Sequence, residues 1–429
     1  MKSKILKLTK KPFVRSVIIM ASGTAAAQVV TMALSPIITR IYGPEAYGLM
    51  GVFMSLVTVI APIGALTYPI AIVLPKKDKE AKELIRLSLI VSIVISAIVA
   101  LLLLFFHQPI VRWFHLQTIS LYLYLIPIVV LCAGIVQVIE QWFIRKKQFG
   151  ITAKTSFLQA VLLQGGKAGI GFFYPTPAVL IVLSALSDGF RALLMIMFTK
   201  KKVMMPSNEL HGKQLSIRKL ANKYKDFPLF RAPEVFLNAI SQSLPILLLT
   251  SFFGPASAGF YSIGKSVLSI PSQLIGKSVG DVFYPRISEA ANNGENLTNL
   301  IKKSTLALGL IGIIPYSFVI ILGPDLFRVV FGEEWKTAGE YARWIALWSF
   351  VGFMNRPSVR ALPILSAQAF HLKFTIFMLA IRVVVLALGY YLFGSDLLAV
   401  AFFGVSGAIL NFILIIMILH KSKSYDDKM

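Results

Sequence analysis

Long apolar runs constrain this chain most, because a run of about 20 apolar residues is the length that crosses a bilayer as a helix. Twelve such runs follow one another along the 429 residues. They are predicted at 13–40, 48–74, 84–106, 118–143, 152–173, 177–198, 232–253, 259–285, 303–324, 338–356, 373–394 and 397–419. Charged residues make up 14% of the chain, against about 25% in an ordinary soluble domain. The sequence therefore predicts an all-α integral membrane protein with twelve transmembrane helices.

Lysine and arginine are unevenly distributed among the loops that join these runs. Of the 43, four are assigned to the interiors of the spans, and 34 to the termini, one alternate set of loops and the span ends beside them. The other loops and their adjoining span ends hold five, Arg40, Arg112, Arg328, Lys336 and Arg343. Cytoplasmic loops carry such an excess, so we predict that both termini are cytoplasmic. Topology then accounts for the net charge of +24, and no nucleic-acid partner is expected. The basic and apolar N-terminus is expected to stay as the first span rather than be cleaved as a signal peptide.

The chain contains an internal repeat. Residues 41–48 (IYGPEAYG) align with residues 252–259 (FFGPASAG) at an offset of 211. A unit of this length is too long for a solenoid and predicts two lobes, 1–198 and 232–429, joined by a basic cytoplasmic linker at 199–231. Six spans in each lobe make the lobes parallel repeats. In transporters built this way the substrate site is a central cavity between the lobes, near the bilayer midplane.

Charged side chains inside a membrane span are costly, so each is a candidate site. Lys167 either lines the cavity or extends to the outer interface. Asp188 and Arg191 are three residues apart and share a helix face, so a local ion pair is expected, with substrate contact as the alternative. Lys265 lies in the outer part of its span. Arg382 is too deep in its span for its side chain to reach the interface.

Two polar faces recur at an offset of 210. In the first span the face is Thr24, Gln28, Thr31 and Ser35, and in the seventh it is Glu234, Asn238, Ser241 and Pro245, beside Gln242. Small polar residues commonly form hydrogen bonds between membrane helices, but recurrence in both halves favours a shared hydrophilic cavity. Three carboxylates are best placed to couple an ion: Asp188, Glu234 and Asp281.

Signatures of enzymes are absent. The chain has no His-Glu-x-x-His, no Gly-x-Ser-x-Gly and no phosphate-binding loop, and its single cysteine, Cys132, excludes a cysteine-based metal cluster. We therefore expect no catalytic residue, no metal and no cofactor. A membrane-bound polysaccharide polymerase or ligase is disfavoured, because the predicted outside loops are too short for a catalytic domain.

Four stretches resemble the polysaccharide transporter family, the O-antigen and capsule repeat-unit flippases of the multidrug/oligosaccharidyl-lipid/polysaccharide exporter superfamily. They are LSPIITRIYGPEAYGLMGVFMSL with AIVLPK, YKDFPLF with LNAISQSLP and FFGPASAGFYS, VFYPRISEA, and VFGEEWKTAGEYA. The resemblance implies a flippase that moves undecaprenyl-pyrophosphate-linked oligosaccharide from the inner to the outer leaflet of the bacterial cytoplasmic membrane by alternating access. It also implies contact with membrane lipid, and polysaccharide polymerase or glycosyltransferase partners. Cations and amides would bind the substrate's pyrophosphate and glycan: Lys167, Arg191, Lys265, Arg382, Gln28, Asn238 and Gln242.

This chain also departs from the family pattern. Lys265 matches a position that is often basic in the family. Residues 67–69 replace a common arginine and acidic residue, whereas Arg231 and Glu234 replace small residues. Arg231 and Glu234 are either a substitute pair or an adaptation to this chain's own glycan. A flippase for the peptidoglycan-precursor lipid stays open as an alternative, as does a scaffolding role in glycan assembly. A multidrug extruder of the same superfamily fits a cationic interior less well.

Overall fold

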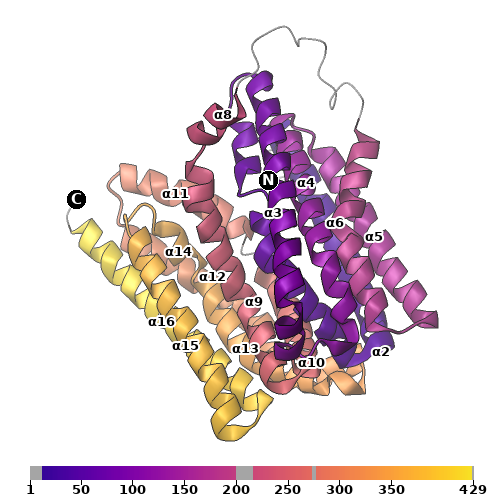
Figure 1. Ribbon diagram of the computed structural model, residues 1–429. Coiled ribbons are helices and arrows are strands. Elements are labelled where there is room, and N and C mark those ends of the chain that lie inside the picture. Colours follow the sequence, from indigo (N-terminus) through magenta and orange to yellow (C-terminus); the bar gives the residue numbers. More distant parts are fainter. Residues whose placement is uncertain (1–11, 200–215, 273–276, 428–429) are drawn as a thin grey trace. The chain divides into compact units, whose positions relative to one another are not determined.

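The computed structural model describes residues 12–199, 216–272 and 277–427, and these ranges contain helices and their connections (Figure 1). Eight of the described helices are long and apolar enough to cross a membrane. The α-helices are α2 (Pro12–Ile60), α3 (Asp78–Trp113), α4 (Ile126–Arg145), α5 (Phe149–Phe173), α6 (Pro177–Phe198), α8 (Ile217–Lys223), α9 (Ala232–Phe253), α10 (Pro255–Pro271), α11 (Lys277–Asn292), α12 (Leu297–Phe331), α13 (Lys336–Met354), α14 (Arg356–Ala361), α15 (Gln368–Phe393) and α16 (Asp396–Asp426). The count of twelve spans and the orientation of the termini stay predictions.

The helices group into two compact units. Unit 1 comprises Met1–Tyr42 and Leu49–Leu247, and unit 2 comprises Gly43–Gly48 and Leu248–Met429. Within unit 1, α3 packs on α4, and α6 packs on both α4 and α5. Within unit 2, α13 is the central helix, because it packs on α10, α12 and α16, and α16 packs in turn on α15. The predicted lobes at 1–198 and 232–429 stay a prediction.

The two aligned Gly-Pro turns have nearly the same backbone conformation. Gly43 has φ 69° and ψ 175°, and Gly254 has φ 90° and ψ 176°. Positive φ is readily adopted only by glycine. In each turn the proline follows at a position where its missing N–H costs little. The internal repeat in the sequence therefore corresponds to a repeated local structure.

Both turns belong to unit 2, where they contact each other reciprocally. A β carbon on Gly48 would lie 1.7 Å from the carbonyl oxygen of Pro255, and one on Gly259 would lie 2.0 Å from the carbonyl oxygen of Pro44. The second glycine of each repeat, Gly48 or Gly259, thus contacts the carbonyl of the proline in the other repeat. A side chain at either position would force the two backbones apart.

The helix predicted over 48–74 ends earlier than the apolar pattern indicates. α2 stops at Ile60, and two 3-10 helices follow, η1 (Ala61–Ile63) and η2 (Tyr68–Val73). The reason is local: Pro62 and Pro69 cannot donate a backbone hydrogen bond. Between them Thr67 has φ 58°, a left-handed conformation that no α-helix contains. The span predicted from 118 likewise opens with a 3-10 helix, η3 (Gln117–Leu125), before α4.

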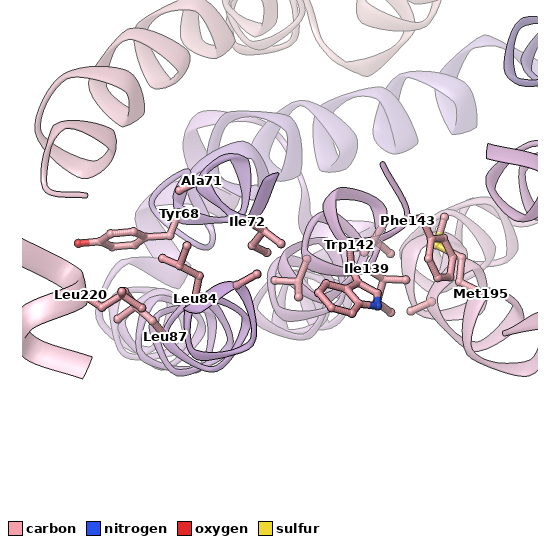
Figure 2. Close-up of a cluster of buried hydrophobic side chains, with 14 residues drawn as sticks. Tyr68, Ala71, Ile72, Leu84, Leu87, Ile139, Trp142, Phe143, Met195 and Leu220 are labelled. Carbon is pink, nitrogen blue, oxygen red and sulfur yellow. The ribbon is translucent and has the colours of Figure 1, made fainter. Parts of the chain in front are cut away.

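The largest side chains in the core of unit 1 come from helices far apart in sequence (Figure 2). Trp142 and Phe143 of α4 are buried, and Met195 of α6 lies against Phe143. Leu220 of the short helix α8 lies beside Leu87 of α3 at the other end of the same cluster. Burial of each such side chain stabilises by about 1.5–3 kcal/mol. The core therefore extends beyond the predicted spans into the predicted linker.

Polar contacts hold the described end of the linker on unit 1. Thr67 Oγ1 donates to the Phe227 carbonyl at 3.0 Å, and Tyr68 Oη donates to the Ala221 carbonyl at 3.4 Å. Glu80 of α3 forms an ion pair with Lys223 and accepts a hydrogen bond from Tyr224 at 3.0 Å. Residues 200–215 of the predicted linker lie outside the described residues.

Candidate functional site

Two predicted cations come together in unit 2. Arg382, near the middle of α15, lies over the rings of Trp348 on α13 and Phe403 on α16, with its Cζ 5.0 Å and 5.5 Å from the ring centroids. These distances are those of cation–π contacts. Lys265 of α10 is half-buried and close enough to Arg382 to interact with it electrostatically. Four helices of one unit thus build a centre with two positive charges and aromatic walls.

Tyr261 adds a polar group to this centre. It lies on α10, one helical turn before Lys265, and its side chain is 0% exposed. Its ring packs edge-on against Phe403 with centroids 6.1 Å apart, and Arg382 acts on it electrostatically. Within the described residues its hydroxyl has no hydrogen-bond partner. A buried hydroxyl beside two cations can donate to an anion that those cations hold.

Unit 1 contains a differently built charged centre. Arg191 Nη2 of α6 lies 2.5 Å from Glu140 Oε1 of α4 and 3.1 Å from Ser156 Oγ of α5. The expected ion pair between Arg191 and Asp188 is wrong: among the described residues, Arg191 pairs with Glu140 instead. The cause is packing, since α4 lies against α6 and presents a carboxylate to the guanidinium from the neighbouring helix.

Asp188 lies close to this pair without joining it. It is half-buried on α6 and interacts electrostatically with both Arg191 and Glu140. The residue before it, Ser187, accepts hydrogen bonds from Gln159 Nε2 at its Oγ (2.7 Å) and at its carbonyl (3.0 Å). The centre therefore has two carboxylates and one guanidinium, and one further positive charge would neutralise it.

Glu140 is not among the site residues predicted from the sequence, because the charges considered within spans were mainly lysines and arginines. The signal was available, because Glu140 falls inside the apolar run 118–143, where a carboxylate needs a partner. The partner itself was not available, since Arg191 is 51 residues away in sequence. Only the packing of α4 on α6 brings the two together.

The remaining predicted residues lie apart from these two centres. Lys167 is half-buried on α5, where its carbonyl accepts a 2.8 Å hydrogen bond from Tyr42 Oη. Gln28 is half-buried on α2, whereas Asn238 and Gln242 are exposed on α9. Asp281 lies on α11, and its side chain is outside the described part of the structure.

Arg231 and Glu234 form an ion pair with each other, and both interpretations of this pair stay predictions. Arg231 Nη1 is 2.9 Å and 2.8 Å from the two carboxylate oxygens of Glu234. Both side chains are at least half exposed, at 50% and 63%, so the pair contributes little to stability. It places a charged, solvent-accessible group at the start of α9, where Glu234 is four residues before Asn238 on the polar face.

Comparison with known proteins agrees with this architecture. Residues 37–340 match the family described as polysaccharide biosynthesis protein. The amylovoran biosynthesis protein AmsL of Erwinia amylovora is 21% identical over 58% of this chain and 63% of its own length. The succinoglycan biosynthesis transport protein ExoT of Rhizobium meliloti (strain 1021) is 22% identical over 74% of this chain and 61% of its own length. The chain thus spans less than two thirds of either relative.

Solved structures have the same fold. An inward-facing multidrug resistance MATE family transporter of the MOP superfamily superposes with a TM-score of 0.71 at 15% identity, covering 96% of this chain and 99% of the transporter. The lipid II flippase MurJ, in an inward closed conformation, superposes with a TM-score of 0.69 at 13% identity, covering 93% and 87%. The TM-scores and coverage establish a shared fold. At these low sequence identities, the substrate has to be argued from the residues.

Proposed function

This chain belongs to the polysaccharide biosynthesis protein family and is a multi-pass bacterial membrane protein, and on that premise we propose that it is a flippase for lipid-linked polysaccharide units. The proposed substrate is an undecaprenyl-pyrophosphate-linked oligosaccharide. The protein moves it from the inner to the outer leaflet of the cytoplasmic membrane by alternating access, for surface polysaccharide biosynthesis.

The observation that carries this proposal is the centre formed by Lys265 and Arg382. A pyrophosphate head is anionic, and a guanidinium matches phosphate oxygens with two parallel hydrogen bonds. Tyr261 supplies a further donor, and partial burial beside the rings of Trp348 and Phe403 strengthens each electrostatic contact. The polyprenyl tail stays in lipid. Outward movement of a negative head is favoured by an inside-negative potential by about 2.3 kcal/mol per charge per 100 mV.

The polar face of α9 supports a hydrated passage for the glycan. Asn238 and Gln242 are exposed on the polar face of a helix whose other residues are mostly apolar. Exposure of an amide to hydrocarbon is costly, so a water-filled space is the favourable surrounding. A sugar chain brings hydroxyl groups that can replace that water one hydrogen bond at a time. Gln28 on α2 and Lys167 on α5 are proposed to line the same passage.

We assign ion coupling to the charged centre of unit 1. A proton or small cation there compensates the excess of one carboxylate over the guanidinium in the Glu140, Asp188 and Arg191 group. Asp188 is preferred to Glu234 as the coupling carboxylate, because Glu234 is exposed and engaged by Arg231. Asp188→Asn is expected to leave the protein folded and to remove the dependence of export on the ion gradient. If export by this variant still depends on the ion gradient, Asp188 is not the coupling carboxylate.

The proposed topology has twelve membrane helices in two six-helix lobes, with both termini cytoplasmic. Its support is the separation of basic residues between alternate loops. Labelling of single cysteines from either side of the membrane tests it. A cysteine at Lys421 is expected to react only from the cytoplasmic side, and one at Lys336 only from outside.

Deletion of the gene tests the function directly. The expected result is loss of surface polysaccharide with accumulation of an undecaprenyl-linked repeat unit in the cytoplasmic leaflet, whose mass identifies the glycan. Accumulation of the peptidoglycan precursor lipid would assign the alternative substrate. Unchanged lipid-linked intermediates together with greater sensitivity to cationic dyes would assign drug extrusion.

A further inference from the structure

Unit 2 contains a cavity that the charged centre at Lys265 and Arg382 does not use. Its volume is about 270 Å³, and it lies where α13 ends, α14 begins and α16 passes. It is lined by Gly352, Asn355, Arg356, Val359, Arg360 and Asn411. From the sequence, both arginines were assigned only to the basic residues whose distribution predicts the membrane topology.

Two guanidinium groups meet at this cavity. Arg356 is half-buried and Arg360 is exposed, and the two are close enough to repel each other electrostatically. Neither forms an ion pair with a carboxylate in the part of unit 2 that the structure describes, where Arg286 and Arg328 are the arginines with acidic partners. Adjacent like charges are unfavourable, and a bound anion would compensate them.

Two asparagines line the cavity beside these arginines, and their amides form a chain of hydrogen bonds. Asn411 Nδ2 donates to the Gly407 carbonyl at 2.8 Å, which fixes the orientation of the Asn411 amide. Asn411 Oδ1 therefore accepts, and Asn355 Nδ2 donates to it at 3.3 Å. This leaves Asn355 Oδ1 buried without a hydrogen-bond partner among the described residues, on a residue that is only 2% exposed.

An unpaired buried acceptor is unfavourable by about 1–3 kcal/mol, so Asn355 Oδ1 points to a ligand with a donor. The two arginines point to an anion on the same ligand. A phosphorylated sugar has both: a phosphate on one ring carbon, and a hydroxyl or acetamido N–H on the next ring carbon. A simple anion satisfies only the arginines, and a neutral sugar satisfies only the amide.

We propose that this cavity binds the phosphorylated first sugar of the lipid-linked substrate, with phosphate on Arg356 and Arg360 and a sugar donor on Asn355. The inference rests on the proposed flippase function. Ordinary ligand pockets have about 300–1,000 Å³, so a cavity of about 270 Å³ holds one sugar phosphate and excludes a longer glycan. Arg356 is the last residue of the tenth predicted span and Arg360 lies in the predicted cytoplasmic loop that follows it, on the side where the proposed function loads the substrate.

Binding to the purified full-length protein in phosphatidylcholine nanodiscs tests the assignment, with N-acetylglucosamine 1-phosphate, glucose 1-phosphate and inorganic phosphate as probes. At least one sugar phosphate is expected to bind more tightly than phosphate. R356Q/R360Q is expected to weaken sugar-phosphate binding by about 10- to 100-fold, the range for charge-assisted hydrogen bonds. The matched control, K302Q/K303Q, removes two exposed charges from the same predicted side of unit 2 and should bind normally.

A second variant changes the volume and leaves the charges in place. A β carbon on Gly352 would meet open space, so Gly352→Leu is expected to fold and to fill part of the cavity. Loss of sugar-phosphate binding in Gly352→Leu, with normal binding in the matched control Gly165→Leu, supports the site. Equal binding by wild type, R356Q/R360Q and Gly352→Leu overturns it.

The anion could instead come from a phospholipid headgroup, and nanodiscs with phosphatidylglycerol separate the two sources. If phosphatidylglycerol displaces the sugar phosphates, the cavity is a lipid site and the proposal is wrong. The experiments also distinguish a wrong assignment of the cavity from a wrong assignment of the flippase function. Accumulation of lipid-linked repeat units on gene deletion, with normal export by R356Q/R360Q, would keep the flippase and reject the cavity.

Discussion

The charged centres of the two units neutralise their cations in opposite ways. In unit 1, Arg191 lies 2.5 Å from Glu140, with a second carboxylate, Asp188, within electrostatic range. In unit 2, Arg382 lies over the rings of Trp348 and Phe403, with a second cation, Lys265, in range. One centre has an excess of acid and the other gathers positive charge between aromatic walls.

Under the proposed function, this difference would separate ion coupling in unit 1 from substrate binding in unit 2. An acidic excess suits a proton or small cation, which is recognised by charge and a few oxygen ligands. A cationic, aromatic-walled centre suits a phosphate-bearing substrate. The repeated turns do not predict this difference, because it depends on a few side chains.

Removal of the cations of unit 2 is expected to have the largest effect. Lys265→Ala and Arg382→Ala are each expected to abolish export of surface polysaccharide, because each removes a charge-assisted contact to the pyrophosphate. Membrane insertion should stay intact. Surface glycan is measured in a deletion strain that expresses each variant, and Lys302→Ala is the matched control. Wild-type surface glycan from both variants would refute the cationic centre.

Removal of the Glu140 carboxylate from the charged centre of unit 1 is expected mainly to lower the stability of the protein. Glu140→Ala leaves the half-buried Arg191 guanidinium without its carboxylate partner, and the loss is expected to fall between the roughly 0–1 kcal/mol of an exposed pair and the about 3 to 5 kcal/mol of a fully buried one. The Tm of the purified protein in detergent measures this loss. The double variant Glu140→Ala/Arg191→Met should recover part of it, since it removes the orphaned charge. A single variant as stable as wild type would show that Asp188 takes over the pairing.

The duplicated turn is the place where the halves are alike, so matched substitutions there should behave alike. Gly48→Ala and Gly259→Ala each place a β carbon against a proline carbonyl, and overpacking of this kind costs about 1–3 kcal/mol. Gly165→Ala is the control, because a β carbon there meets open space. Thermal unfolding of the three variants measures the effect. A large loss in only one of the two turn variants would contradict the reciprocal contact.

The smallest effect is expected at an exposed ion pair of unit 2, Arg286 with Glu295. The Arg286 guanidinium lowers the pKa of the Glu295 carboxyl. The ion pair therefore stabilises the fold above the unfolded-state pKa of Glu295, and this stabilisation is lost as the pH falls through the folded-state pKa of Glu295. Glu295→Gln should remove that part of the acid dependence of Tm and change Tm least of all these variants. A large loss of Tm at neutral pH would show that the pair does more than an exposed pair does.

Much of the fold could be predicted from local pattern. Apolar runs predicted long helices because each spanning helix satisfies its own backbone hydrogen bonds, and the Gly-Pro turns at 43 and 254 were visible as a repeat. The break after Ile60 was less accessible, since the run 48–74 stays apolar through Pro62 and Pro69. Candidate charges were also visible singly, because any charge in an apolar run stands out.

The sequence by itself determined that this is a helical membrane protein with an internal repeat and which charges lie within its apolar runs. Only the tertiary structure decided which of those charges meet. It paired Arg191 with Glu140 rather than with its neighbour Asp188, placed Arg382 over the rings of Trp348 and Phe403, and brought Asn411 beside Asn355, Arg356 and Arg360. The physical reason is that helix periodicity is a local property, whereas a charge finds its partner across the packing of separate helices.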